Sequence, residues 1–189
     1  FDDLFSQSAR PLSYLLPVSV HPVFGKFTER FVGTKFYGMS FTEHALYLGW
    51  VALFFAFMSF RAWRNKLKDI KLGSEDNFNI GFFLSLAVTA WFFSQPPWWN
   101  IFGIKLYMPS FLMYKILPVF RAYCRFGIIV MLAVAFLASF GFDFFSQRFK
   151  TRRTKIIMAV LSYGLVLFEF WNYPPFKIID FKAPAAYYW

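Results

Sequence analysis

Residues 127–142 read GIIVMLAVAFLASFGF, an uninterrupted run without a charged side chain. A helix of this composition suits the hydrocarbon interior of a bilayer, where the backbone must satisfy its own hydrogen bonds. Similar runs occur at 45–60, 78–93 and 156–168. The pattern predicts an all-α membrane protein, a helical bundle with about four transmembrane helices, at approximately 44–60, 78–95, 127–145 and 156–171.

The loops between these runs differ sharply in charge. Segments 61–71 and 147–155 each carry five Lys or Arg residues, whereas the segments on the other side are longer and more thinly charged. Short basic loops face the cytoplasm in most membrane proteins. The predicted topology therefore places 61–71 and 147–155 inside, and both ends of the chain outside.

The remaining segments are predicted to be external. Residues 1–43 form a loop region rich in Pro and Gly, and 172–189 form an external tail. Segments 12–16 and 109–117 have apolar side chains beside a proline, which is typical of short interfacial or re-entrant helices. The chain begins without Met, and neither end has a terminal signal, so we expect a fragment truncated from a longer protein.

The charge distribution excludes a nucleic-acid partner. The net charge is +10, but ten of the twenty basic residues lie in the two short loops beside apolar runs. A nucleic-acid binder places its cations along one solvent-exposed face or groove. The partners predicted here are membrane lipids and their anionic headgroups.

No site for a cofactor is visible in the sequence. Asp2 and Asp3 are interpreted as a solvated loop pair, and His21 and His44 are too far apart to suggest a metal site. The ionisable residues nearest the predicted spans, Glu43, His44, Asp143 and Glu169, lie within about one turn of a helix end. An ion-coupled transporter needs such groups near the midplane of the membrane. Transport is therefore the least favoured of the three functions considered below.

The segment 118–127 carries the candidate site. Arg121 and Arg125 are four residues apart, and so on one face if the segment is helical, at the external mouth of the third predicted span. Their guanidinium groups suit a phosphate such as the headgroup of a polyprenyl phosphate. The alternative is that they bind ordinary lipid phosphates or cap loop carbonyls.

Three stretches carry a resemblance to a known superfamily. The first is Ser8-Ala9-Arg10-Pro11-Leu12-Ser13-Tyr14-Leu15-Leu16-Pro17, followed by His21-Pro22 and Gly25. The second is Phe120-Arg121 with Arg125-Phe126 before an Ala-rich span, and the third is Glu169 before Pro174-Pro175. In this order they resemble the later part of the membrane domain of bacterial GT-C glycosyltransferases, over nearly the whole chain.

The resemblance implies a sugar transfer from a polyprenyl-phosphate-linked donor at the external face of the bacterial cytoplasmic membrane. It also implies that the catalytic acidic residue lies in an upstream loop, where a divalent metal would belong, so this chain is expected to have no catalytic residue. Its expected role is to form part of the lipid-donor cavity. Enzymatic activity is thus left open, and the alternative is a non-enzymatic scaffold or lipid-handling protein.

Overall fold

The computed structural model describes residues 4–5, 7–32, 46–65, 74–120 and 122–172. This part of the chain is mostly helical, with one short β-hairpin. The elements are η1 (Pro11–Tyr14), α2 (Gly25–Val32), α3 (Trp50–Asn65), α4 (Ser74–Ser94), β1 (Trp98–Ile101), β2 (Ile104–Tyr107), α5 (Pro109–Ile116), η3 (Tyr123–Arg125), α6 (Phe126–Ser146) and α7 (Arg152–Glu169).

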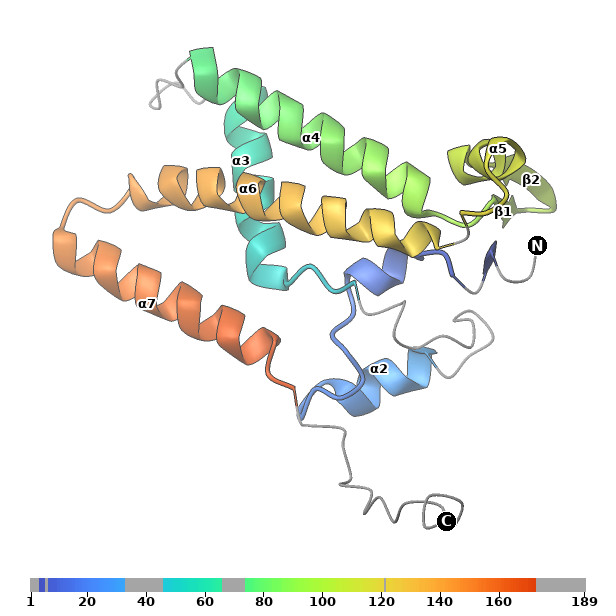
Figure 1. Cartoon of the computed structure of the whole chain (residues 1–189). Helices are drawn as coiled ribbons and strands as arrows, with labels where there is room; N and C mark the ends of the chain where they lie inside the picture. Colours follow the sequence, from blue (N-terminus) through green and yellow to red (C-terminus); the bar gives the residue numbers. More distant parts are fainter. Residues whose placement is uncertain (1–3, 6, 33–45, 66–73, 121, 173–189) are drawn as a thin grey trace, which may run out of the picture.

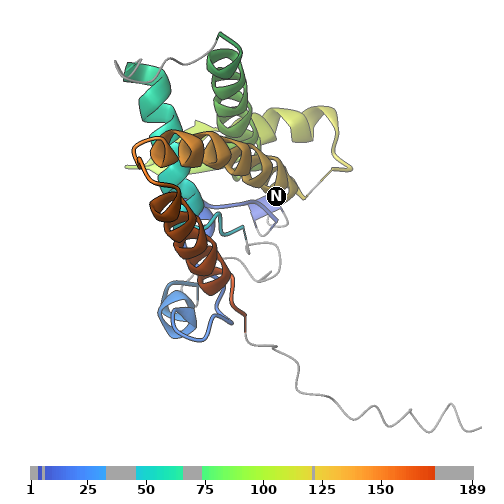
Figure 2. The same cartoon turned by 90° about the vertical axis from the view of Figure 1, so that its left-hand side faces the viewer.

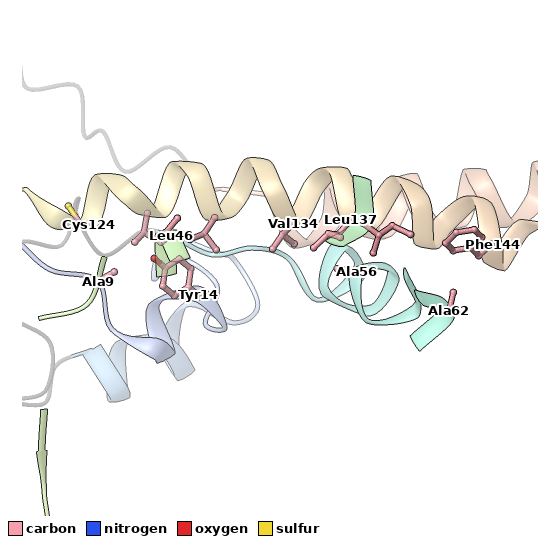
Figure 3. Packing of buried hydrophobic residues seen from close by; sticks show 12 residues of the cluster. Ala9, Tyr14, Leu46, Ala56, Ala62, Cys124, Val134, Leu137 and Phe144 are labelled. Carbon is pink, nitrogen blue, oxygen red and sulfur yellow. The ribbon is translucent and has the colours of Figure 1, made fainter. Parts of the chain in front are cut away.

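Helix α6 is the centre of the molecule, crossed by α3 and flanked by α4 (Figure 1). Helices α4 and α6 are antiparallel: Phe93 near the end of α4 contacts Phe126 at the start of α6, and Phe83 stacks on Phe136 at 4.4 Å. The buried residues of α6 lie along one face of the helix: Gly127, Val130, Ala133, Val134, Leu137, Gly141 and Phe144. Figure 3 shows Val134, Leu137 and Phe144 beside α3.

Small residues allow the backbones of α3 and α6 to approach closely. Ala56 and Ser59 of α3 are buried, and a Cβ atom placed on Gly141 would lie only 1.7 Å from the carbonyl oxygen of Phe55. Helices pack in this way in lipid, where apolar attraction alone does not bring them together.

Two helical segments, Glu75–Ser94 and Tyr123–Ser146, are long and apolar enough to cross a membrane. Only 17% and 33% of their most apolar windows are buried inside the protein, whereas the core helix of a soluble protein is mostly buried. This exposure favours a membrane protein. Helix α3 is shorter, and α7 begins with Arg152, Arg153 and Lys155, so four transmembrane helices remain a prediction.

Several helix ends differ from the predicted spans. Helix α3 begins at Trp50 rather than near residue 44, because Gly49 has a φ of +84° and interrupts the helix there; 44 and 45 lie outside the described residues. Helix α3 then continues past 60 to Asn65. Helix α4 begins at Ser74, before the predicted 78, since Glu75 and Asp76 stabilise the positive end of the helix dipole.

The β-hairpin was not predicted from the sequence, which indicated only helices and loops. Strands β1 and β2 pair antiparallel, with Trp98 opposite Tyr107 and Ile101 opposite Ile104. Both turn residues, Phe102 at φ 50° and Gly103 at φ 86°, are left-handed, as a two-residue hairpin turn requires. The short helix predicted at 109–117 is confirmed as α5, with Pro109 in its first turn.

The two ends of the bundle differ in chemistry. Helix α6 ends and α7 begins at one end, here called the basic end, where Arg148 and Lys150 occupy the connecting loop (Figure 1). The end of α4, the hairpin, α5 and the start of α6 form the other, here called the hairpin end. Figure 2 shows α7 running from the basic end towards α2.

Candidate functional site

The hairpin end contains an open groove with a volume of about 610 Å³, within the range of small-molecule binding sites. One side comes from the segment that leads into η1, and the other from the residues between α4 and the hairpin turn. The described residues that line the groove are Phe5, Arg10, Pro11, Leu12, Pro96, Trp98, Trp99, Asn100 and Ile101.

Hydrogen bonds fix the two sides of the groove to each other. The backbone N–H of Ala9 donates to the carbonyl oxygen of Ser94 at 2.8 Å, and the Tyr14 hydroxyl donates to Ser94 Oγ at 2.7 Å. Tyr14 is 3% exposed, and this burial raises the pKa of its hydroxyl to about 12, although the hydrogen bond with Ser94 acts against the rise. The groove is therefore supported by a buried network rather than by loops alone.

Aromatic side chains stiffen the hairpin side of the groove. The rings of Trp98 and Phe5 meet edge to face with centroids 4.8 Å apart. The ammonium group of Lys105, on β2, lies 5.4 Å from the centroid of Trp98, a cation–π distance. A backbone hydrogen bond of 2.9 Å from Met108 to Pro97 closes the base of the hairpin. Large rigid side chains thus form a fixed apolar wall.

Arg10 is the one charged side chain among the described residues that line the groove. It is half-buried at the entry to η1, where its backbone N–H donates to Ser13 Oγ at 3.3 Å. A guanidinium group beside prolines and indoles combines a phosphate-binding fork with an apolar surface. Asn100 adds an amide that can both donate and accept hydrogen bonds. The combination fits an amphiphile with an anionic headgroup.

The structure describes one of the two predicted site residues, Arg125. Arg121 lies outside the described residues. Arg125 is exposed at the end of η3, immediately before α6. A 3.0 Å backbone hydrogen bond from Cys124 to the carbonyl oxygen of Gln7 joins η3 to the segment that carries Arg10. Arg125 therefore lies at the same end of the bundle as the groove, but it is not one of the described lining residues.

Arg10 is the functional candidate that the sequence analysis missed. It belongs to the stretch 8–17 that carries part of the resemblance, but nothing local distinguishes it from an ordinary loop cation. The signal that identifies it is tertiary, because it depends on the contact between Ala9 and Ser94, which are far apart in sequence.

A second polar cluster joins α3, α7 and the segment before α2. The Glu169 carboxylate, 5% exposed, accepts the backbone N–H of Val51 in the first turn of α3, at 3.1 and 3.3 Å. A Cβ atom on Gly49 would lie 3.0 Å from this carboxylate. Glu169 is therefore engaged in capping the N-terminus of α3, which is a structural role.

His21 has a similar structural role. Its Nδ1 accepts the backbone N–H groups of Val23 and Phe24, so the proton is assigned to Nε2, which donates to the carbonyl oxygen of Phe168 at 2.9 Å. Within the described part of the chain no group of three or more His, Cys, Asp or Glu residues is placed to hold a metal ion. Asp2, Asp3 and His44 lie outside that part.

Comparisons with protein-family models, with curated proteins and with solved structures find no match to this chain. The function is therefore inferred from the groove and from the chemistry of its residues.

Proposed function

We propose that the groove at the hairpin end binds the phosphate headgroup of a membrane lipid, and that this lipid is a polyprenyl-phosphate-linked sugar donor. The chain would then form part of the donor cavity of a GT-C-like glycosyltransferase in the bacterial cytoplasmic membrane, as the resemblance in sequence implies. In this proposal the hairpin end faces outward and the basic end faces the cytoplasm.

The observation that supports the proposal is the position of Arg10, the one charged side chain among the described residues of a groove lined mainly by apolar and aromatic side chains. A soluble phosphate compound would not need indole and proline walls, whereas an isoprenoid chain gains free energy by contact with them. Arg125 at the same end adds positive charge near the groove.

A non-enzymatic lipid-handling protein is the second candidate, because the same groove suits it. The two candidates differ in the part of the lipid that they recognise. A donor cavity should bind a polyprenyl-phosphate sugar more tightly than the sugar-free polyprenyl phosphate, since the Asn100 amide and its neighbours can bind sugar hydroxyls. A general lipid carrier should bind both alike.

The proposal is tested by titrating the protein in nanodiscs with a short-chain polyprenyl phosphate. Arg10→Gln should weaken binding by roughly 10–100-fold, the effect of removing a charge-assisted hydrogen bond of about 1.5–3 kcal/mol. Arg10→Lys should also bind less tightly than the parent, because Lys keeps the charge and loses the planar pair of donors. Arg148→Gln is the matched control, since Arg148 is exposed at the basic end.

Equal binding by Arg10→Gln and the parent would refute the groove as a headgroup site. Arg125→Lys separates specific binding from generic anchoring: a specific contact predicts a loss of about 1–3 kcal/mol, whereas a generic anchor predicts no change. Arg121→Lys belongs in the same series, because Arg121 lies four residues before Arg125 in the sequence.

A further inference from the structure

The β-hairpin and α5, with the residues that follow to 120, present an unusually apolar surface. This set of residues, 98–120, is called the hairpin unit. Strand β2 is exposed along its whole length, and Phe102 at the turn is fully exposed, at 101% of its reference area. Other large apolar side chains of the unit that are exposed include Ile101, Ile104, Leu112, Ile116 and Val119. Exposed apolar groups gathered on one unit mark a binding surface.

The geometry of the turn holds Phe102 outward. Its φ of 50° is unusual for a bulky residue, and glycine would satisfy it with less strain. Paired strands fix the turn on both sides, from Trp98–Tyr107 to Ile101–Ile104. A large apolar side chain at a strained and solvent-facing position lowers the stability of the isolated protein. Contact with an apolar partner would offset this cost.

The charge of the unit points to an anionic surface. Its charged residues are Lys105 and Lys115, with no Asp or Glu in 77–142. The ammonium group of Lys115 lies 4.7 Å from the centroid of Phe111, and that of Lys105 lies near Trp98. Cations next to aromatic rings beside apolar residues are typical of the membrane interface, where the rings lie at the headgroup level.

The place of the unit in the fold specifies a lipid surface rather than a soluble partner. It follows α4 after three residues and precedes α6, and these are the two helices able to cross a membrane. Figure 1 places α5 at the edge of the molecule, beyond the ends of α4 and α6, and Figure 2 also shows α5 at an edge. The unit is therefore tethered on both sides at the height of a bilayer surface.

We propose that the hairpin unit docks into the membrane, with Phe102 and Ile104 in the acyl region of the adjacent leaflet and Lys105 and Lys115 at anionic headgroups. This docking depends on α4 and α6 crossing the membrane, and it is independent of headgroup recognition by Arg10. Since Trp98 belongs to both the hairpin and the groove, docking also fixes one wall of the groove at the level of the headgroups.

The depth of the turn can be measured directly. Phe102→Cys carries an environment-sensitive dye, and the protein is placed in phosphatidylcholine nanodiscs that contain a lipid with a spin label near the top of its acyl chain. Cys124 is 4% exposed, so the parent chain should not react with the dye. Absence of labelling in the parent confirms that the dye in the variant is at position 102. The matched control is the same dye at Glu29→Cys, an exposed charged position on α2.

Docking predicts that the lipid quencher acts several-fold more strongly at 102 than at 29, and that aqueous iodide does the reverse. Phosphatidylglycerol in the nanodisc should increase the difference, and Lys105→Gln with Lys115→Gln should remove that increase. Equal quenching at the two positions would overturn the proposal. Protection of 102 only in nanodiscs that hold two copies would also overturn it, because the turn would then contact a second copy of the chain.

Discussion

Replacing Gly141 by Ala is the sharpest test of the packing between α3 and α6. A Cβ atom at 141 would lie 1.7 Å from the carbonyl oxygen and 2.6 Å from the carbonyl carbon of Phe55, and 3.1 Å from the backbone nitrogen of Ser59. All three atoms belong to the backbone of α3, so no side-chain rotation relieves the contact. The two helices must move apart by more than about 1 Å, because Cβ atoms do not pack closer than 3.0 Å.

The expected cost follows from this separation. Inserting a methyl group into a well-packed site costs about 1–3 kcal/mol, and a contact made with helix backbone belongs at the upper limit of that range. Alanine in place of glycine within a helix raises the free energy of unfolding by about 1 kcal/mol. We therefore expect Gly141→Ala to lower the free energy of unfolding by about 2 kcal/mol, the difference between these two terms.

The assay is unfolding of the detergent-solubilised protein by sodium dodecyl sulfate, followed by circular dichroism. Gly164→Ala is the matched control: Gly164 lies within α7, and a Cβ atom there meets no other atom within 4 Å. The free energy of unfolding of Gly164→Ala should rise by up to about 1 kcal/mol, because alanine has the higher helix propensity. The two substitutions are chemically identical, so their opposite signs isolate the contact with α3. Equal stability of the two variants would refute the close crossing of α3 and α6.

Three further predictions concern other parts of the fold. Glu169→Gln should lower the free energy of unfolding by about 1 kcal/mol in the same assay, because the charge at the N-terminus of α3 is lost while an oxygen that can accept the Val51 N–H remains; unchanged stability would show that the charge does not contribute there. The raised pKa of Tyr14, about 12, means that the unfolded chain ionises first, so stability is unaffected below about pH 10 and declines as the pH rises through 12; ultraviolet titration should show late tyrosinate absorbance that Tyr14→Phe reduces, and an unchanged titration curve would contradict the burial. Thr151→Cys in intact cells should resist a membrane-impermeant thiol reagent while Asn172→Cys reacts, and the reverse pattern would invert the predicted topology.

The helices could be predicted from the sequence because the patterns that indicate a helix are local. An apolar run without charges predicts a helix wherever the backbone must pair internally, and α3, α4, α6 and α7 all lie on such runs. The short helix α5 was predicted for a comparable reason, since Pro109 fits the first turn of a helix. The helix ends were less accurate: Gly49, where the helix is interrupted, packs against the buried Glu169, which lies on another helix.

The hairpin and the groove were not predictable because their signals are weak or non-local. The turn places Phe102 in a conformation usually occupied by Asn, Asp or Gly, so Gly103 alone indicated it. Arg10 becomes a candidate only when the segment around it pairs with the end of α4. Such contacts are set by the packing of the whole bundle, which no local pattern encodes.

The central position of α6 also has a consequence for biosynthesis. Helix α3 makes most of its helix–helix contacts with α6 and few with α4, although α4 follows it directly in sequence. When the ribosome has made α3 and α4, their main shared partner has not yet been translated. In the predicted four-helix membrane topology, the face of α3 that carries Ala56 and Ser59 would be covered by lipid or by the insertion machinery until α6 is complete. Chains that stop before residue 146 are therefore expected substrates for membrane quality control, even though α3 and α4 themselves are intact.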